Sequence, residues 1–412
     1  MRVLVAPDCY TGTLTAPEAA EALAAGWLAG APGDQVERCP LSDGGPGFVE
    51  VLAEALAGTM HHERVSGPTG ETVRAQILLH VGSDGVPTAY LESAHACGAH
   101  LVPPGLRDPG RTGTGGVGQL LVRARRLGAR RIVVGLGGSG TNDAGAGMLL
   151  ALAAADALAD TDALAAAEAL AYTEALAPDG PRAAHRLGSG GAGLRGVTPA
   201  DLHFLAPLRE RWRDVELVAA TDVDSPLLGP RGASLGYSPQ KGACPQRARE
   251  LEAALGDFAQ AVGVLRPDLS ADLPGAGAAG GLGFALALLG ARRARGADTV
   301  MSAVGFSGRV AGRDLVVTGE GRFDWQSLRG KVVSAVAARG LAAGVPVVVV
   351  PGQVAPGPVP DLPGVRAVHP VVRDAGDPAS ARALARALSD PRAALAGTAR
   401  RIARATASGE RS

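Results

Sequence analysis

The stretch "RRIVVGLGGSGTNDAGAGM", residues 130–148, decides the fold class of this chain. An apolar, β-branched run ends in glycines, and a segment of small residues then begins a helix. A strand that enters a helix in this way is typical of a parallel sheet covered by helices. The glycines also let backbone N–H groups approach an anion, and the start of the helix adds partial positive charge. The stretch therefore predicts an α/β fold with an anion-binding loop.

The same alternation of strand and helix recurs along the whole chain. Helical stretches rich in Ala, Leu and Arg occur at 16–29, 119–127 and 248–263. The apolar runs show little alternation of polar and apolar residues, as expected for strands that are buried on both faces of a parallel sheet. The further runs are RVLVA (2–6), TVRAQILLH (72–80), VELVAAT (215–221), RDLVVTG (313–319) and VPVVVVPG (345–352).

Polar and glycine-rich motifs directly follow five of these strands. Ligands bind beyond the carboxyl ends of the strands of a parallel sheet. We therefore expect the five motifs to converge on one crevice. They are Asp8 after the first run, the glycine run from Gly137 after RRIVVGL, Asp222 and Asp224 after VELVAAT, Glu320 and Asp324 after RDLVVTG, and Pro351-Gly352 after the last run.

Composition excludes several classes of protein. The 412 residues have a formal net charge of +0 and only 3% aromatic residues, which argues against a nucleic-acid or anionic-membrane partner. The length suggests two or three domains. There is no long apolar run and no signal-peptide pattern at the N-terminus, so we expect a cytoplasmic protein without a membrane span. The four cysteines form no CxxC pair and are expected to be reduced thiols rather than metal ligands.

Carboxylates and lysines accompany the glycines in the later motifs. Asp222 and Asp224 lie two residues apart and suit Mg²⁺, although an Asx-turn and a cap would explain them too. Of 40 basic residues only Lys241 and Lys331 are lysines, and each lies beside a glycine. An ammonium is more compact than a guanidinium, so we hypothesise that both reach into a site with phosphates; chance survival on the surface is the alternative. Carboxylates, glycines and one lysine in each loop, together with Asp43 in "LSDGGPG", are typical of a site for phosphoryl transfer.

The glycine motifs allow more than one interpretation. In residues 137–148, the hydroxyls of Ser139 and Thr141 can donate hydrogen bonds to a ligand. Asn142 and Asp143 either bind a ligand or simply cap the helix. Gly135, Gly137 and Gly140 match GxGxxG, but the region about twenty residues on, where a dinucleotide site needs an acid, reads as helix. A nicotinamide- or flavin-dependent oxidoreductase is therefore a minor alternative. A second glycine run contains Gly275, Gly277, Gly280 and Gly281.

Six blocks resemble the successive signatures of the bacterial type I glycerate kinases. They occur in the order of that family and cover most of the chain up to residue 352. The blocks are VAPDCYTGTLTAPEAAEAL, PLSDGGPG, GLGGSGTNDAGAGML, DVDSPLLGPRGASLGYSPQKGA, PGAGAAGGLG and VVTGEGRFDWQSLRGK.

The resemblance implies an ATP- and Mg²⁺-dependent kinase that converts D-glycerate, or a close hydroxy acid, into a phosphoglycerate. It implies a flavodoxin-like domain from residues 1–65 and 283–412, an inserted α/β domain at 66–282, and an active site in the cleft between them. The partners would be small molecules, with a monomer or homodimer both open.

The resemblance also implies roles for individual residues. Asp222 and Asp224 would hold Mg²⁺, and Lys241 and Lys331 would neutralise the phosphate or the substrate carboxylate. Asp43 or Asp8 would be the general base. The nucleotide- or substrate-binding set would be Asp8, Gly137, Gly138, Ser139, Thr141, Asn142, Asp143, Gly275, Gly277, Gly280, Gly281, Glu320 and Asp324.

The early blocks depart from the family pattern. Thr11 replaces the usual lysine, Pro46 replaces a glutamate, and Gly115 stands where an aromatic residue is usual. A non-catalytic metabolite- or nucleotide-binding paralogue of the same fold is therefore the alternative function.

Overall fold

The computed structural model describes residues 1–10, 12–157, 180–324, 327, 331–354, 361–373 and 378–408, and it divides the chain into two compact units. The first unit comprises Met1–Asp43, Glu50–Leu56 and Arg295–Ser412, and the second comprises Gly44–Val49 and Ala57–Ala294. These bounds differ from those expected at 65/66 and 282/283. Strand β3 (Thr59–Ser66) pairs with β4 (Thr72–Val81), and β8 (Arg292–Ala294) pairs with β7 (Glu216–Ala220), so both belong to the second unit.

The first unit contains a five-stranded, all-parallel sheet with the order β13-β11-β9-β1-β2. Numbered along the chain, these strands read 2-1-3-4-5 from one edge, which is the flavodoxin-like order. The predicted flavodoxin-like sheet built from both chain ends is thus confirmed. Its strands are β1 (Arg2–Val5), β2 (Gln35–Arg38), β9 (Leu315–Thr318), β11 (Val347–Val349) and β13 (Val365–Val368).

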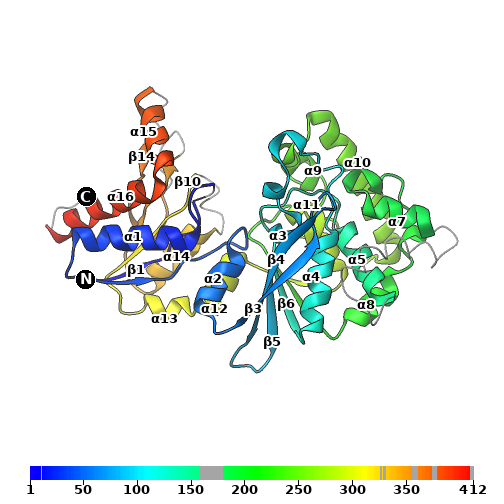
Figure 1. Cartoon of the computed structure of the whole chain (residues 1–412), viewed down its shortest axis with the longest axis horizontal. Coiled ribbons are helices and arrows are strands. Elements are labelled where there is room, and N and C mark those ends of the chain that lie inside the picture. The colour runs from blue at the N-terminus through cyan, green and yellow to red at the C-terminus, as the bar shows by residue number, and fades with distance from the viewer. Residues whose placement is uncertain are drawn as a thin grey trace. The chain divides into compact units, whose positions relative to one another are not determined.

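Helices from the two ends of the chain pack together in this unit (Figure 1). Helix α1 (Ala16–Gly30) lies against α16 (Pro391–Ala407), and a Cβ at Gly26 would lie 2.1 Å from the Ala396 oxygen. Glycine therefore permits the close approach of the two helices, and the arginine-rich tail packs through a buried face. Other elements of the chain are α2 (Phe48–Ala55), α12 (Gly296–Ala303), α13 (Phe306–Val310), α14 (Val332–Ala342) and α15 (Pro378–Ser389), and a small parallel sheet of β10 (Arg322–Phe323), β12 (Gln353–Val354) and β14 (Val372–Arg373).

The second unit contains a six-stranded mixed sheet with the order β3-β4-β5-β6-β7-β8. The four strands from β5 (Pro87–Glu92) through β6 (Arg131–Gly135) to β8 are parallel, whereas β4 is antiparallel to both neighbours. The expectation that TVRAQILLH belongs to a parallel arrangement is therefore wrong. Short turns at 67–71 and 82–86 flank β4, and a short turn can join only antiparallel strands.

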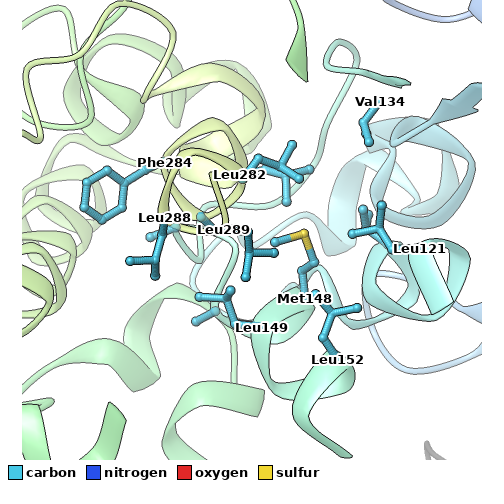
Figure 2. Close-up of a cluster of buried hydrophobic side chains, with 14 of the residues drawn as sticks. Leu121, Val134, Met148, Leu149, Leu152, Leu282, Phe284, Leu288 and Leu289 are labelled. Atoms are coloured by element: carbon cyan, nitrogen blue, oxygen red, sulfur yellow. The ribbon is translucent and has the colours of Figure 1, made fainter. Parts of the chain in front are cut away.

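A buried apolar cluster fixes the helix that follows β6 (Figure 2). Helix α5 (Ala146–Ala157) contributes Met148, and α11 (Ala278–Leu288) contributes Leu282. Helix α4 (Gly115–Arg126) packs closely on α5. A Cβ at Gly118 would lie 2.5 Å from the Met148 oxygen, so glycine is needed for this close approach. The remaining helical elements here are α3 (Ala94–Cys97), α7 (Gly180–Gly188), α8 (Leu205–Trp212), α9 (Ala233–Tyr237), α10 (Pro245–Leu265), and 3-10 turns at Ala99–Leu101, Pro104–Leu106, Gly191–Leu194, Pro199–Leu202 and Pro239–Lys241.

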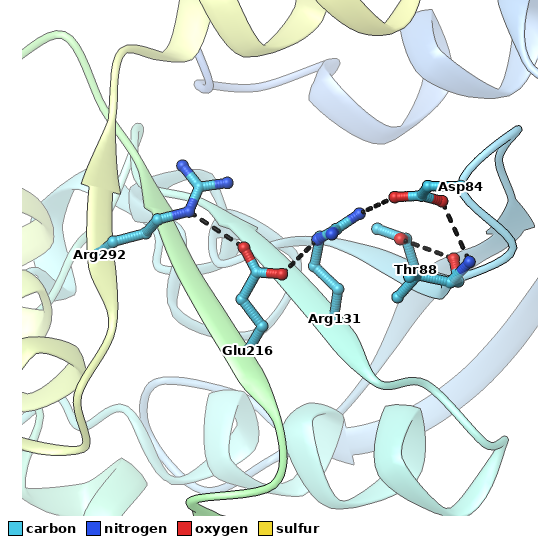
Figure 3. Close-up of polar contacts among 6 residues, drawn as sticks. Asp84, Thr88, Arg131, Glu216 and Arg292 are labelled. Carbon is cyan, nitrogen blue, oxygen red and sulfur yellow. Dashed lines mark hydrogen bonds and ion pairs between the residues drawn. The ribbon is translucent and has the colours of Figure 1, made fainter.

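Ion pairs join the starts of three parallel strands in this sheet (Figure 3). Glu216 accepts hydrogen bonds from Arg131 Nε at 2.6 Å and from Arg292 Nε at 3.1 Å, and Arg131 also binds Asp84 at 2.8 Å. Burial opposes the charge on Glu216, but the two arginines outweigh it and lower its pKa. These pairs lie at the amino ends of the strands, opposite to the ends that carry the glycine-rich motifs. Within the described part of the chain, none of the helices combines the length and the apolar character that a membrane span requires.

Candidate functional site

The five strand-end motifs are divided between two sheets. Strands β1, β9 and β11 belong to the first unit, and β6 and β7 belong to the second. The strand-end argument applies within one sheet, so it groups the motifs into two clusters, one in each unit, and a single crevice for all five motifs stays a prediction. We call Asp8, Asp43, Glu320, Asp324 and Lys331 the carboxylate cluster, and residues 137–145 the glycine loop.

The carboxylate cluster lies beyond the ends of three adjacent strands. Asp8 follows β1, Glu320 follows β9, and Asp43 follows β2. The strand pairing continues into these loops, because Asp8 N donates to Gly319 O at 2.9 Å and Leu41 N donates to Pro7 O at 2.9 Å. Neighbouring strands thus deliver three carboxylates to one edge of the sheet.

Burial and mutual repulsion shape the acidity of this cluster. Asp8 is 8% exposed; burial first, then the charge of Asp43, raise its pKa well above the ordinary value. Burial raises the pKa of Glu320 to about 7, while a hydrogen bond from Ser327 and the charge of Lys331 act in the opposite direction. Carboxyl groups with raised pKa values in a shared site are frequent among catalytic acids and bases.

Tyr10 borders the carboxylate cluster, although no motif in the sequence pointed to this residue. Its hydroxyl donates a short hydrogen bond to Val350 O, and a Cβ at Gly319 would lie 2.2 Å from that hydroxyl oxygen. Burial, together with Glu320 and Asp8, raises the pKa of Tyr10 well above its ordinary value. Because the Tyr10 proton is used on Val350, it is not available to the carboxylates.

Lys331 joins the carboxylates from the start of helix α14, where it occupies the N-cap position. Its positive charge partly offsets the rise in the pKa values of Asp8 and Glu320 that burial causes. Asp324 N donates to Ser327 Oγ at 3.1 Å, and the charge of Asp324 acts on Glu320. The structure therefore brings Lys331 together with the acidic residues, as the motif predicts.

Lys241 is buried, with 4% exposure, and holds the glycine loop. Its ammonium donates to Ser139 Oγ at 2.9 Å and to Thr141 O at 2.7 Å. A 3-10 turn carries it, and Gly242 ends that turn at φ +103, where a Cβ would lie 2.5 Å from Arg107 O. Burial lowers the pKa of Lys241 to about 8, although Cys97 and Asp143 favour its charge.

Asp143 and Asn142 are both fully buried and serve the loop itself. The Asp143 carboxylate accepts from Thr114 N and Oγ1, both at 2.8 Å, and from Gly145 N at 3.1 Å and Gly147 N at 3.2 Å. Asn142 Nδ2 donates to Ser234 Oγ at 3.0 Å. The contacts of Asp143 favour the capping interpretation, whereas Asn142 binds the Ser234 side chain and does not cap the helix. Thr114 and Ser234 could not be recognised from the sequence, because they lie far from the loop along the chain.

The glycines at 275–281 pack against other backbone segments. A Cβ at Gly277 would lie 2.2 Å from Pro226 O, and one at Gly281 would lie 2.6 Å from Ala144 Cα. A Cβ at Gly275 would meet the Arg293 side chain at 2.9 Å. Close packing is therefore sufficient to explain glycine here, and a role in cradling an anion stays a prediction.

Replacement of Gly280 by alanine is expected to destabilise the protein. Gly280 has φ +72, and its Cβ would lie 2.0 Å from Thr141 O, so both strain and a backbone clash result. We expect a loss of about 1–3 kcal/mol. The matched control is Gly256→Ala in helix α10, where the Cβ meets nothing within 4 Å and a gain of about 0.5–1 kcal/mol is expected. Urea denaturation checks both; equal midpoints for Gly280→Ala and the parent would contradict the described packing.

Asp224 occupies a different environment from the one expected of a metal ligand. Its side chain is 70% exposed and forms an ion pair with Arg293, which also donates to Val223 O at 3.4 Å. A cation bound at Asp222 and Asp224 would therefore have to displace a guanidinium. The Mg²⁺ assignment to this pair stays a prediction that the local charges do not favour.

Pro46, one of the departures from the family pattern, packs on the glycine loop. A Cβ at Gly138 would lie 2.8 Å from Pro46 Cγ, and one at Gly137 would lie 2.5 Å from Gly45 Cα. The segment at 44–46 thus covers the start of the loop. Thr11, the other principal departure, lies outside the described residues, as do residues 158–179.

Comparisons with known proteins identify relatives along almost the whole chain. A profile described as the Glycerate kinase family matches residues 3–407. Glycerate kinase of Bacillus subtilis strain 168 is 38% identical over 355 residues, covering 86% of this chain and 85% of that protein. Glycerate 2-kinase of Escherichia coli K12 is 39% identical over 339 residues, covering 82% and 81%. A crystal structure assigned as glycerate kinase 2 from Salmonella typhimurium LT2 has a TM-score of 0.70 and 33% identity, covering 100% of this chain and 99% of that one.

Proposed function

The chain belongs to the glycerate kinase family and is a kinase, and from this we propose that it transfers the γ-phosphoryl group of ATP to D-glycerate or a close hydroxy acid. The observation that carries the proposal is the match from residue 3 to 407, which includes both clusters. The name of the Escherichia coli relative further supports the 2-hydroxyl as the acceptor.

The carboxylate cluster supplies the acid–base chemistry in this proposal. A general base works best when its pKa lies near the operating pH, and burial raises the pKa of Asp8 in that direction. Asp8 is therefore assigned as the base for the substrate hydroxyl, in preference to Asp43. Lys331 balances part of the negative charge beside it.

The glycine loop supplies an anion site in this proposal. Lys241 Nζ donates to Ser139 Oγ, so the Ser139 hydroxyl accepts there and its own proton remains available to an anion. A buried ammonium close to this hydroxyl favours negative charge. Gly137, Gly138, Ser139 and Thr141 are assigned to a phosphate or carboxylate group of a substrate, while Asn142 and Asp143 hold the loop in shape.

Mg²⁺ is the cofactor that this function implies. When bound, the ion neutralises phosphate charge and orients the transferring group. The pair Asp222 and Asp224 is a poor fit, since Arg293 already binds Asp224.

Release of ADP from ATP tests this function directly. We expect ADP release that requires both D-glycerate and Mg²⁺, with 2-phosphoglycerate identified by ³¹P NMR. A thermal-shift panel separates the alternatives, since a ligand at 100 times its Kd stabilises by about 2.7 kcal/mol. Stabilisation by ATP without turnover would indicate the non-catalytic paralogue, and stabilisation by NAD but not by ATP would overturn the kinase.

A further inference from the structure

We propose that Glu92 is a positioning residue for the anion site of the glycine loop. This residue is buried, with 2% exposure, and the phosphoryl transfer proposed for this chain gives it no part in the chemistry. The inference rests on the proposed function, in which the loop at 137–141 binds a phosphate or carboxylate group. It adds that Glu92 fixes residues 44–48 against the loop, so that the anion site keeps one shape.

Glu92 holds the backbone of residues 44–48 through two hydrogen bonds. Its Oε2 atom accepts from Gly47 N at 2.9 Å and from Phe48 N at 3.0 Å. Phe48 begins helix α2, and the positive end of a helix dipole favours a carboxylate at this place. Hydrogen bonds to an ionised acceptor are roughly twice as strong as those between neutral groups. His95 Nε2 lies 3.8 Å from the same oxygen, which is too far for a hydrogen bond.

The segment at 44–48 lies directly on the glycine loop. A Cβ at Gly137 would lie 2.5 Å from Gly45 Cα, and one at Gly138 would lie 2.8 Å from Pro46 Cγ. Packing therefore stops the segment from moving closer to the loop, and the two hydrogen bonds to the carboxylate stop it from moving away.

Both sides of the glycine loop are attached to the end of strand β5. Glu92 is the last residue of β5, which pairs with β6, the strand that leads into the loop. The chain beyond β5 reaches the other side of the loop, where Ala99 N donates to Gly138 O at 2.9 Å. That side is joined to β5 through the chain itself, whereas residues 44–48 are joined to it through Glu92. Loss of the Glu92 acceptor should therefore loosen one side of the loop and leave the other in place.

Replacement of Glu92 by methionine removes the acceptor and keeps an unbranched side chain. We expect KM for the substrate that the loop binds to rise by about 10–100-fold, because a small misplacement of binding groups is enough for such a loss. The kcat value and the KM of the other substrate should change little. Steady-state kinetics with varied ATP and varied D-glycerate measures this, and the affected substrate should be the one that responds to Lys241→Met. A purely structural role predicts the opposite pattern, since a smaller folded fraction lowers kcat and leaves both KM values unchanged.

Two further variants isolate the acceptor from general effects of charge. Glu92→Gln keeps an oxygen with two lone pairs that can accept from both amides, so its KM should lie closer to that of the parent than to that of Glu92→Met. Asp84 lies near the opposite end of β5, where it accepts from Val86 N at 3.0 Å and pairs with Arg131. Asp84→Leu therefore also removes a carboxylate that holds a backbone amide, and it should leave both KM values unchanged. Circular dichroism verifies that each variant is folded.

Calorimetry repeats the comparison without turnover, with a non-hydrolysable ATP analogue and with D-glycerate as the probes. The Kd of one of the two compounds should rise in Glu92→Met, in parallel with its KM. Unchanged KM and Kd values in folded Glu92→Met would overturn the positioning role. Equal losses in Glu92→Met and Glu92→Gln would overturn it too, because the charge rather than the acceptor would then matter.

The failure of this inference is separable from failure of the proposed function. Glycerate-dependent ADP release together with unchanged KM values in Glu92→Met would remove the positioning role and leave the kinase. A parent that releases no ADP, but binds one probe more tightly than Glu92→Met does, would remove the kinase function and leave the positioning role. A parent that binds neither probe would overturn both.

Discussion

Replacement of Lys241 by methionine is expected to lower kcat/KM by a factor on the order of 10²–10³, the range seen when one preorganised donor is removed from an active site. Methionine keeps the apolar stem but removes the ammonium that binds Ser139 Oγ and Thr141 O. The glycine loop then loses its buried positive charge, and the Ser139 hydroxyl is no longer oriented. Steady-state kinetics with varied ATP and varied glycerate measures the loss and shows which substrate the loop serves.

Two further variants separate this role from a general effect of charge or packing. Lys241→Arg keeps the charge, but the wider guanidinium does not fit a position that is 4% exposed, so we expect a substantial loss of activity there as well. Arg213→Met removes an exposed cation of the same unit, whose side chain is 74% exposed, and should leave kinetics unchanged. Full activity in folded Lys241→Met would show that the lysine only supports packing.

The pH dependence of Lys241 is expected to move activity and stability in opposite directions. Burial lowers its pKa from 10.5 to about 8 in the folded protein. Between these values the unfolded chain holds the proton and the folded chain does not, so the free energy of unfolding rises with pH in that window. At about 1.36 kcal/mol per pKa unit, the gain approaches about 3 kcal/mol by pH 10.5. Below pH 8 both states are protonated, and this gain is absent.

Activity follows the protonated form, so kcat/KM should fall above about pH 8 as the ammonium is lost. Other groups titrate in the same range, and the comparison with Lys241→Met isolates this one. Relative to that variant, the parent should gain stability from pH 8 to 10.5 in denaturant titrations. Parallel stability curves for the two proteins across this window would contradict the assignment.

The sequence was sufficient to predict the α/β class and most of its elements. Buried parallel strands are apolar along their length, and RRIVVGL and RDLVVTG could be read without knowledge of their neighbours, as β6 and β9 bear out. The family resemblance supplied the flavodoxin-like order, which no single segment encodes. Strand β4 was misassigned because its direction depends on the turns around it rather than on its own residues.

The sequence also identified the polar residues of both clusters, since glycines, carboxylates and the two lysines stand out in this composition. It could not decide what each side chain contacts. Asp143 reads as a ligand-binding residue until its four donors from Thr114, Gly145 and Gly147 are seen. From the sequence, Lys241 is either a lysine that reaches phosphates or a surface residue kept by chance, and only tertiary packing shows that it is buried against Ser139.

Tertiary structure alone decided which motifs share a site. Asp8, Asp43 and Glu320 are separated by up to some three hundred residues, and only the strand order β9-β1-β2 makes them neighbours. The physical reason is that residue type is local, whereas burial, charge pairing and the pKa of Glu320 depend on groups brought from elsewhere in the chain. The sequence determined which chemical groups are present, and the folding of two separate sheets determined which of them act together.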